Sequence, residues 1–259
     1  MKGRKYFYRK HILHEPEVQT VPSPAMKLGS MVDSLISGET PRYSVKVLKR
    51  EDEHLFERQK TMDTEDFVTS TQWEDALSHA VTLKNTPAYK WYKDNGAKFQ
   101  TLLTGEYTSP AGDVIPLCGI ADVITETKDA VYIDDFKVVA FEKISSGQKW
   151  IWNCQDMGYF RQLAFYKMLW QQMNPDDKRP VICRHLVSTK VKYTRGYFRA
   201  ATFVVKDDIL ENALANQMQW MNRIAYCIKQ DEWEDQEVTW DNALNLRYES
   251  RDQESNQTK

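Results

Sequence analysis

The sequence lacks several features that would each assign the protein to a distinct class. Its four cysteines, Cys118, Cys154, Cys183 and Cys227, include no closely spaced pair, which disfavours a zinc site or a disulfide framework and fits a reducing cytoplasm. No apolar run approaches membrane-spanning length, and no apolar signal-peptide core follows the basic N-terminal residues. We therefore expect a cytoplasmic protein that does not associate with a membrane.

The sequence also lacks a strong excess of either charge. Its formal net charge is −2, so overall charge neither requires nor excludes a nucleic-acid partner, and DNA would need a local basic surface. A hydrophobic content of 41% over 259 residues is typical of a globular chain that buries a core. Because no repeat and no clear linker is visible, we predict one domain over residues 1–231 and a polar, mobile tail over 232–259.

Hydrophobic periodicity predicts alternating helices and strands. Helices are expected over 25–37, over 70–94 with a break at Thr86-Pro87, over 151–173 as one long helix, and from Asp207 or Asp208 to about residue 230. Strands are expected over 43–48, 99–108, 114–125, 130–139, 181–189 and 197–205. The pattern predicts an α/β protein in which helices flank a mixed central sheet.

Charged residues interrupt an apolar hairpin in the middle of the chain. If Thr127–Ala130 forms its turn, Asp122 lies opposite Asp135, Lys137 shares their face, and Asp134 points to the other face. Two adjacent carboxylates repel unless a cation lies between them, and oxygen ligands favour Mg²⁺ or Mn²⁺. A metal-bound water could then attack a phosphodiester. A cross-strand surface charge pair without function is the competing interpretation.

A second motif lies in the helix expected after the hairpin. Gln155, Tyr159, Gln162 and Tyr166 are spaced four, three and four residues apart, so they share a narrow stripe of that helix. Amides and phenols suit a surface that hydrogen-bonds a nucleic-acid backbone or supports a catalytic site. A half-buried packing seam explains the same spacing.

The order of these motifs resembles a known enzyme family. Gly29-x-x-x-Asp33 in a helix, then Asp122, Asp135-Phe-Lys137 and Gln162-Leu-Ala-Phe-Tyr166 resemble the PD-(D/E)xK nuclease superfamily. Within this superfamily the sequence resembles the RecB-like branch, and it is most similar to phage-type exodeoxyribonuclease VIII (RecE-like) exonucleases. The resemblance covers roughly Pro24 to Val205 and implies a restriction-endonuclease-like fold. Each motif is weak alone, but four in the correct order are more specific.

The resemblance implies a catalytic set and a metal cofactor. Asp122 and Asp135 would bind Mg²⁺, with Mn²⁺ as the alternative, and Lys137 would be the catalytic lysine. Gln162 and Tyr166 match the Gln-x-x-x-Tyr element of the family, which supports the site and contacts DNA.

Other residues receive secondary roles. Asp33 stands where many RecB-like nucleases place a metal-binding histidine; because a carboxylate also binds Mg²⁺, Asp33 is a third candidate ligand. Glu106 is either an outer ligand or an ordinary strand-edge charge. Candidate DNA contacts lie near the helix or in a late turn, where a merely solvated loop is the alternative: Gln155, Tyr159, Arg161, Lys190, Lys192 and Arg195.

The activity implied by the resemblance is 5′-to-3′ exonuclease action on the ends of linear double-stranded DNA. It would leave single strands for an annealing or recombinase protein, in a bacterial or phage-infected cell, and relatives often form rings around DNA. Two alternatives stay open: another RecB-like nuclease that acts on single strands or on particular structures, and an inactive DNA-binding or partner-docking protein of the same fold. No iron–sulfur cluster is expected, because that requires four clustered cysteines.

Overall fold

The structure, a computed structural model, describes residues 8–9, 13, 22–38, 46–48, 67–191 and 198–233. The chain forms two compact units, one of Met1–Thr20 with Tyr226–Lys259 and the other of Val21–Ala225. In the first unit the rings of Tyr8 and Trp233 stack with their centroids 4.8 Å apart. Nearly all of the predicted tail lies outside the described residues. No described helix has both the length and the apolar character needed to cross a membrane.

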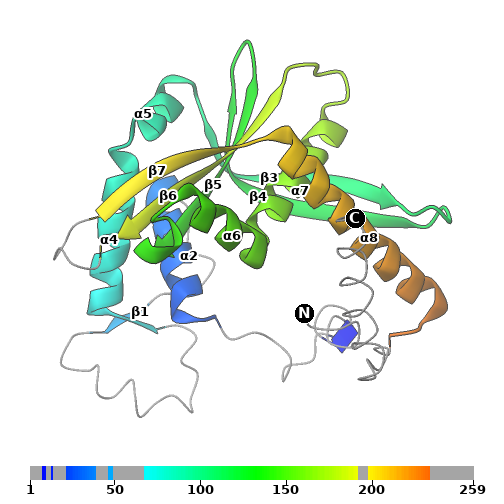
Figure 1. Ribbon diagram of the computed structural model, residues 1–259, viewed down its shortest axis with the longest axis horizontal. Helices are drawn as coiled ribbons and strands as arrows, with labels where there is room; N and C mark the ends of the chain where they lie inside the picture. The colour runs from blue at the N-terminus through cyan, green and yellow to red at the C-terminus, as the bar shows by residue number, and fades with distance from the viewer. Residues whose placement is uncertain are drawn as a thin grey trace, which may run out of the picture. The chain divides into compact units, whose positions relative to one another are not determined.

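A five-stranded mixed sheet forms the centre of the second unit (Figure 1). Strands β5 and β6 are parallel and all other neighbours are antiparallel. The predicted hairpin register is observed, since Val123 lies opposite Asp134 and Ile124 opposite Ile133. In spatial order the strands are β3 (Lys98–Thr108), β4 (Val114–Glu126), β5 (Val131–Ala140), β6 (Val181–Lys190) and β7 (Phe198–Val205).

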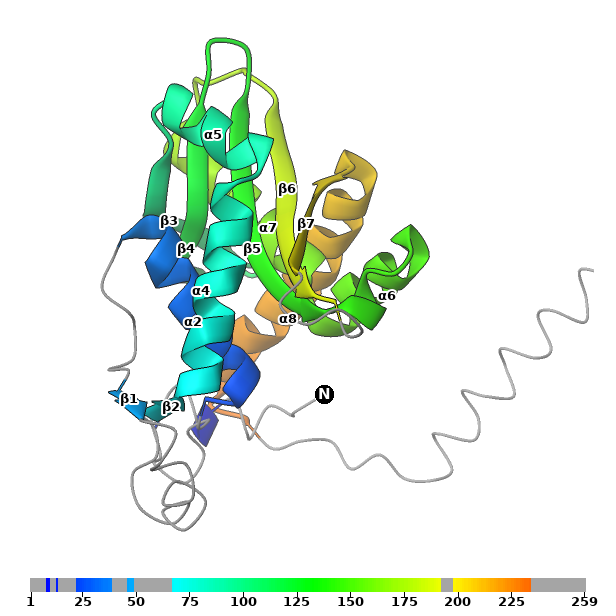
Figure 2. The same ribbon diagram turned by 90° about the vertical axis from the view of Figure 1, so that its left-hand side faces the viewer.

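Helices cover both faces of this sheet (Figure 2). One face packs against α2 (Pro24–Ser37), α4 (Ser70–Lys84) and α5 (Pro87–Asp94). The other packs against α6 (Gly147–Met157), α7 (Tyr159–Met173) and the start of α8 (Asp207–Gln230). The short helix η5 (Phe141–Lys143) follows β5. A parallel pair, β1 (Lys46–Leu48) and β2 (Phe67–Thr69), lies outside the main sheet, and residues 43–45 of the predicted first strand lie outside the described residues.

The predicted single helix over 151–173 is wrong, because the chain divides it at Gly158. Gly158 has φ = 74°, a left-handed conformation that glycine adopts without strain, and its N–H bonds carbonyls in the last turn of α6. A Cβ at this position would lie 2.7 Å from Nη2 of Arg161. The break places Gln155 on α6, away from the other members of the predicted stripe, which lie on α7.

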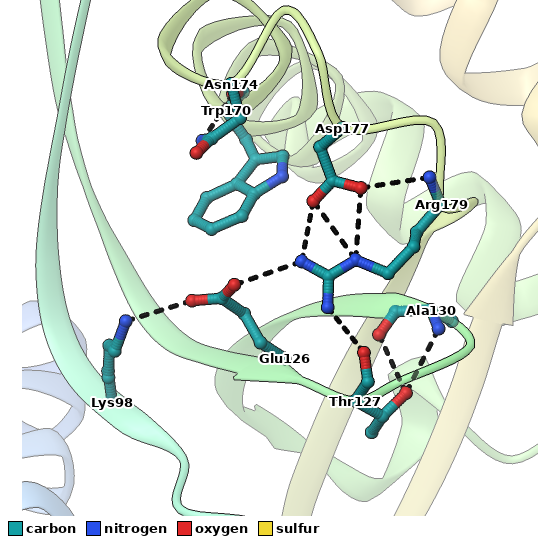
Figure 3. A network of polar contacts seen from close by, with 8 residues as sticks. All are labelled: Lys98, Glu126, Thr127, Ala130, Trp170, Asn174, Asp177 and Arg179. Atoms are coloured by element: carbon teal, nitrogen blue, oxygen red, sulfur yellow. Dashed lines mark hydrogen bonds and ion pairs between the residues drawn. The ribbon is translucent and has the colours of Figure 1, made fainter.

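A polar network holds the turn between β4 and β5 (Figure 3). The guanidinium of Arg179 donates to the Thr127 carbonyl and pairs with Asp177 at 2.6 Å and with Glu126 at 3.1 Å. Glu126 also pairs with Lys98 at 2.9 Å. The network ties the loop before β6 to the hairpin turn and to β3, so it helps to keep the β4–β5 register on which the candidate site depends.

Candidate active site

A cavity of about 600 Å³ opens beside β5. Its walls come from α2, the three strands β3 to β5, the end of α6 and the start of α7. Residues far apart in the sequence therefore meet at one place. Seven of the residues predicted from the motifs line it: Asp33, Asp122, Asp135, Lys137, Tyr159, Gln162 and Tyr166.

Asp122 and Asp135 stand one position beyond the last regular pair of the β4–β5 ladder. Oδ2 of Asp122 accepts a hydrogen bond of 2.8 Å from the backbone N–H of Phe136, which fixes this side chain. Asp122 is 8% exposed and Asp135 is fully buried. Burial raises the pKa of Asp135, and the neighbouring Lys137 ammonium opposes that rise. Oδ2 of Asp135 is paired with the Lys137 ammonium, and neither oxygen of Asp135 accepts a hydrogen bond of regular geometry within the described part of the chain.

Lys137 lies between the carboxylates and α7. Its ammonium forms an ion pair with Asp135, donates to Oε1 of Gln162 at 3.2 Å, and lies 4.8 Å from the ring centroid of Tyr159. Burial by itself lowers the pKa of Lys137, but the carboxylates of Asp135 and Asp122 outweigh burial and hold the pKa above its ordinary value. In this arrangement Lys137 is therefore a positive charge and a hydrogen-bond donor.

Lys137, Gln162 and Tyr166 form a short hydrogen-bond relay. Nε2 of Gln162 donates to the Tyr166 hydroxyl at 2.9 Å, while its Oε1 accepts from Lys137. Burial raises the pKa of Tyr166 to about 12, so the phenol is neutral. The ring fits because β4 has glycine at position 119, where a Cβ would lie 2.9 Å from Cε1 of Tyr166. The relay keeps the Lys137 ammonium aimed at the cavity.

The oxygen donors of the cavity fit a hard divalent cation. Asp122 and Asp135 lie close together and both line the cavity. Mg²⁺ usually binds one or two carboxylates and takes its other ligands from water and substrate phosphate. Asp33 lines the same cavity, yet in the described residues no three His, Cys, Asp or Glu side chains are grouped closely enough to hold one ion. Asp33 as a third ligand stays a prediction.

Other predicted residues lie away from the cavity. Glu106 is exposed on β3, six residues from the cavity-lining Gln100, which is roughly 20 Å along a strand. The ammonium of Lys190 pairs with Asp75 of α4 at 2.7 Å, so its charge is already partnered. Neither Gln155 nor Arg161 lines the cavity. Lys192 and Arg195 lie outside the described residues.

The structure adds residues to the site that no motif indicated. His185 is buried on β6, and its Nε2 lies 3.8 Å from Oδ2 of Asp135. Burial lowers the pKa of His185 to about 3, so its ring is neutral. The parallel β5–β6 register places His185 beside Asp135, and no local pattern reveals that register. Gln100 on β3 and the serines of α2, Ser30, Ser34 and Ser37, also line the cavity.

Comparison with known proteins identifies the fold. No protein-family model and no curated protein matches the sequence. A crystal structure of a proposed exonuclease from Eubacterium rectale aligns with a TM-score of 0.54 and 18% identity, over 88% of this chain and 76% of that chain. Another solved structure aligns with a TM-score of only 0.35 and 12% identity, over 75% of this chain and 84% of its own. The predicted fold class is confirmed: a mixed sheet flanked by helices, shared with the Eubacterium protein.

Proposed function

We propose that the protein is a nuclease that uses a divalent metal ion to hydrolyse phosphodiester bonds in DNA. The observation that carries this proposal is the meeting of Asp122, Asp135 and Lys137 in one cavity, with a hydrogen-bond relay behind the lysine. A surface charge pair would not require a fully buried carboxylate that lines a cavity together with a second carboxylate. The fold shared with a proposed exonuclease supports the same chemistry.

Each residue has a defined part in this chemistry. Asp122 and Asp135 would hold the cation, and the Phe136 N–H keeps Asp122 in place. Such a cation would supply a water of lowered pKa as the nucleophile and would offset the charge of the phosphate. Lys137, held as an ammonium, donates to a non-bridging phosphate oxygen and stabilises the charge that develops there. Gln162 restrains Lys137, so the ammonium needs little reorganisation during the reaction.

We further propose that the enzyme degrades one strand of linear double-stranded DNA from its end in the 5′-to-3′ direction. The remaining strand would pass to a single-strand annealing or recombinase protein. Support comes from the resemblance of the motif order to RecE-like exonucleases of the RecB-like branch. A ring-shaped homo-oligomer belongs to the same proposal, because encircling DNA would retain it despite a net charge of only −2.

The test is digestion of linear duplex DNA labelled at either the 5′ or the 3′ ends, with Mg²⁺ or with EDTA. The wild type is compared with Lys137→Ala and with Lys128→Ala, a matched change of an exposed lysine in the β4–β5 turn. We expect early release of 5′-labelled nucleotides that requires both Mg²⁺ and Lys137 but not Lys128.

Other results would overturn either a part of the proposal or the whole of it. Early release of the 3′ label, or digestion of single strands alone, would keep the nuclease and overturn its polarity or substrate. Intact DNA with every divalent metal would overturn the nuclease and favour an inactive DNA-binding protein of the same fold.

A further inference from the structure

Gln100 adopts a left-handed backbone conformation near the start of a β-strand. Its φ is 47°, in a region that glycine enters freely and asparagine or aspartate enters at moderate cost, whereas glutamine is not favoured there. Such conformations persist only where the surrounding structure imposes them, and they cluster at functional sites. The sheet therefore has a strained point at Gln100.

This strained residue adjoins the candidate metal ligands. On either side of it the β3–β4 ladder is regular, with Phe99 opposite Val123 and Thr101 opposite Ala121. The pair between them, Gln100 with Asp122, does not form. Of the residues of β3, Gln100 alone lines the cavity. The local distortion thus gives the cavity a side chain that a regular strand would not be expected to supply.

The chemistry of the cavity explains why an amide is useful at this position. The charged groups that line it are three carboxylates, Asp33, Asp122 and Asp135, and a single ammonium, Lys137, which already serves Asp135 and Gln162. A phosphodiester entering this cavity needs further N–H donors. The Gln100 amide is half-buried and has no hydrogen-bond partner among the described residues. It offers two N–H donors without adding another negative charge.

We propose that Gln100 is a substrate-binding residue whose side-chain amide donates to a non-bridging phosphate oxygen of a DNA strand beside Asp122. The proposal rests on the proposed nuclease function. The distorted backbone holds the amide at the cavity before the substrate arrives, so that less conformational freedom is lost when DNA binds.

The test uses a short fluorescein-labelled DNA duplex, with Ca²⁺ in place of Mg²⁺ to slow hydrolysis, and measures Kd by fluorescence anisotropy and Tm by calorimetry. Gln100→Gly removes the amide, so we expect Kd to rise about tenfold. The same change relieves the left-handed strain, so we expect Tm to rise by about 2–4 °C. Gln100→Asn keeps an amide and tolerates the conformation, so Kd should stay within about threefold of wild type.

A neighbouring position separates binding from general damage to the strand. Thr101 lies on the same strand but does not line the cavity. Thr101→Gly should lower Tm, because glycine weakens a regular strand, and should leave Kd unchanged. The assignment would be established if Gln100→Gly raises both Tm and Kd, while Thr101→Gly lowers Tm and leaves Kd unchanged.

The possible results distinguish failure of the Gln100 assignment from failure of the nuclease function. If Gln100→Gly binds DNA as the wild type does while the wild type cleaves DNA with Mg²⁺, only the Gln100 assignment is overturned. A fall in the Tm of Gln100→Gly would contradict the strain from which the proposal starts and would also overturn it. If the wild type neither binds nor cleaves DNA, the nuclease function and the Gln100 assignment fail together.

Discussion

Two consecutive aspartates of β5 are both fully buried, yet their surroundings are opposite. Asp134 lies near Tyr92 of α5, and both of its oxygens accept hydrogen bonds of 2.6 Å from Arg184. The guanidinium of Arg184 lies 5.0 Å and 4.5 Å from the ring centroids of Trp91 and Tyr132. Asp135 faces the cavity, pairs with the Lys137 ammonium, and has no regular hydrogen bond at either oxygen among the described residues.

The difference between the two aspartates shows what marks a site in this protein. Burial raises the pKa of both carboxyl groups, and a basic neighbour opposes the rise in each case. Burial and the direction of the pKa shift therefore do not separate a structural carboxylate from a candidate metal ligand. The two carboxylates differ instead in their surroundings: both oxygens of Asp134 accept hydrogen bonds from Arg184, whereas Asp135 lines a cavity beside Asp122, where a cation could bind.

Replacement of the cavity-facing aspartate should have the largest effect. Asp135→Asn removes the charge of a proposed metal ligand, so we expect kcat for DNA cleavage to fall by about 10³-fold or more, while Tm stays within a few degrees because Asp122 still offsets the charge of Lys137. Asp134→Asn should show the reverse pattern, with a lower Tm and a kcat near that of wild type. Steady-state digestion and calorimetry on both variants make the comparison, and equal losses of kcat would contradict it.

The next largest effect is expected from breaking the buried ion pair between Asp134 and Arg184. Arg184→Ala leaves Asp134 as a buried, uncompensated charge, so we expect the free energy of unfolding to fall by about 3–5 kcal/mol. The double variant Asp134→Leu/Arg184→Met replaces both charges with apolar groups and should recover most of that loss. Urea unfolding measures both. An Arg184→Ala protein as stable as the wild type would show that Asp134 is not held by this pair.

A buried histidine of α4, His79, also predicts a pH dependence of stability. Nδ1 of the buried His79 lies 2.8 Å from Oγ of Ser188, and burial lowers the pKa of His79 from 6.5 to about 4. Between these values the unfolded chain binds a proton that the folded chain does not. The stability that the folded protein owes to neutral His79 is fully present above pH 6.5. The free energy of unfolding falls by about 3 kcal/mol as the pH falls from 6.5 to 4.

The variant His79→Gln isolates this effect, because glutamine can still hydrogen-bond Ser188 but does not titrate. Urea unfolding at a series of pH values should show a flatter curve for the variant than for the wild type between pH 6.5 and 4. Parallel curves would mean that His79 does not cause the pH dependence.

The smallest effect is expected from the relay behind Lys137. Tyr166→Phe removes the hydroxyl that accepts from Gln162 but keeps the ring that packs against Gly119. We expect kcat to fall about tenfold through looser positioning of the lysine, with little change in KM or Tm. A loss as large as that of Asp135→Asn would show that Tyr166 acts in the chemical step itself.

The sequence was sufficient for features that depend on local rules. The hairpin turn and strand alternation fixed the register, and with it the opposite directions of Asp134 and Asp135. Features that depend on contacts between distant segments, or on unusual backbone conformations, were not predicted. His185 reaches Asp135 only through the parallel β5–β6 register, Gly158 breaks a helix across which the apolar pattern continues, and nothing in the sequence signals the left-handed φ of Gln100.

The proposed function requires that Asp135 form part of a metal site. The most direct measurement is calorimetric titration of Mn²⁺ into the DNA-free wild type, Asp135→Ala and Asp129→Ala, the last being an exposed aspartate in the β4–β5 turn. We predict equal affinity in the wild type and Asp129→Ala, and no detectable binding in Asp135→Ala. Unchanged Mn²⁺ binding in Asp135→Ala, or no binding in the wild type, would contradict the account.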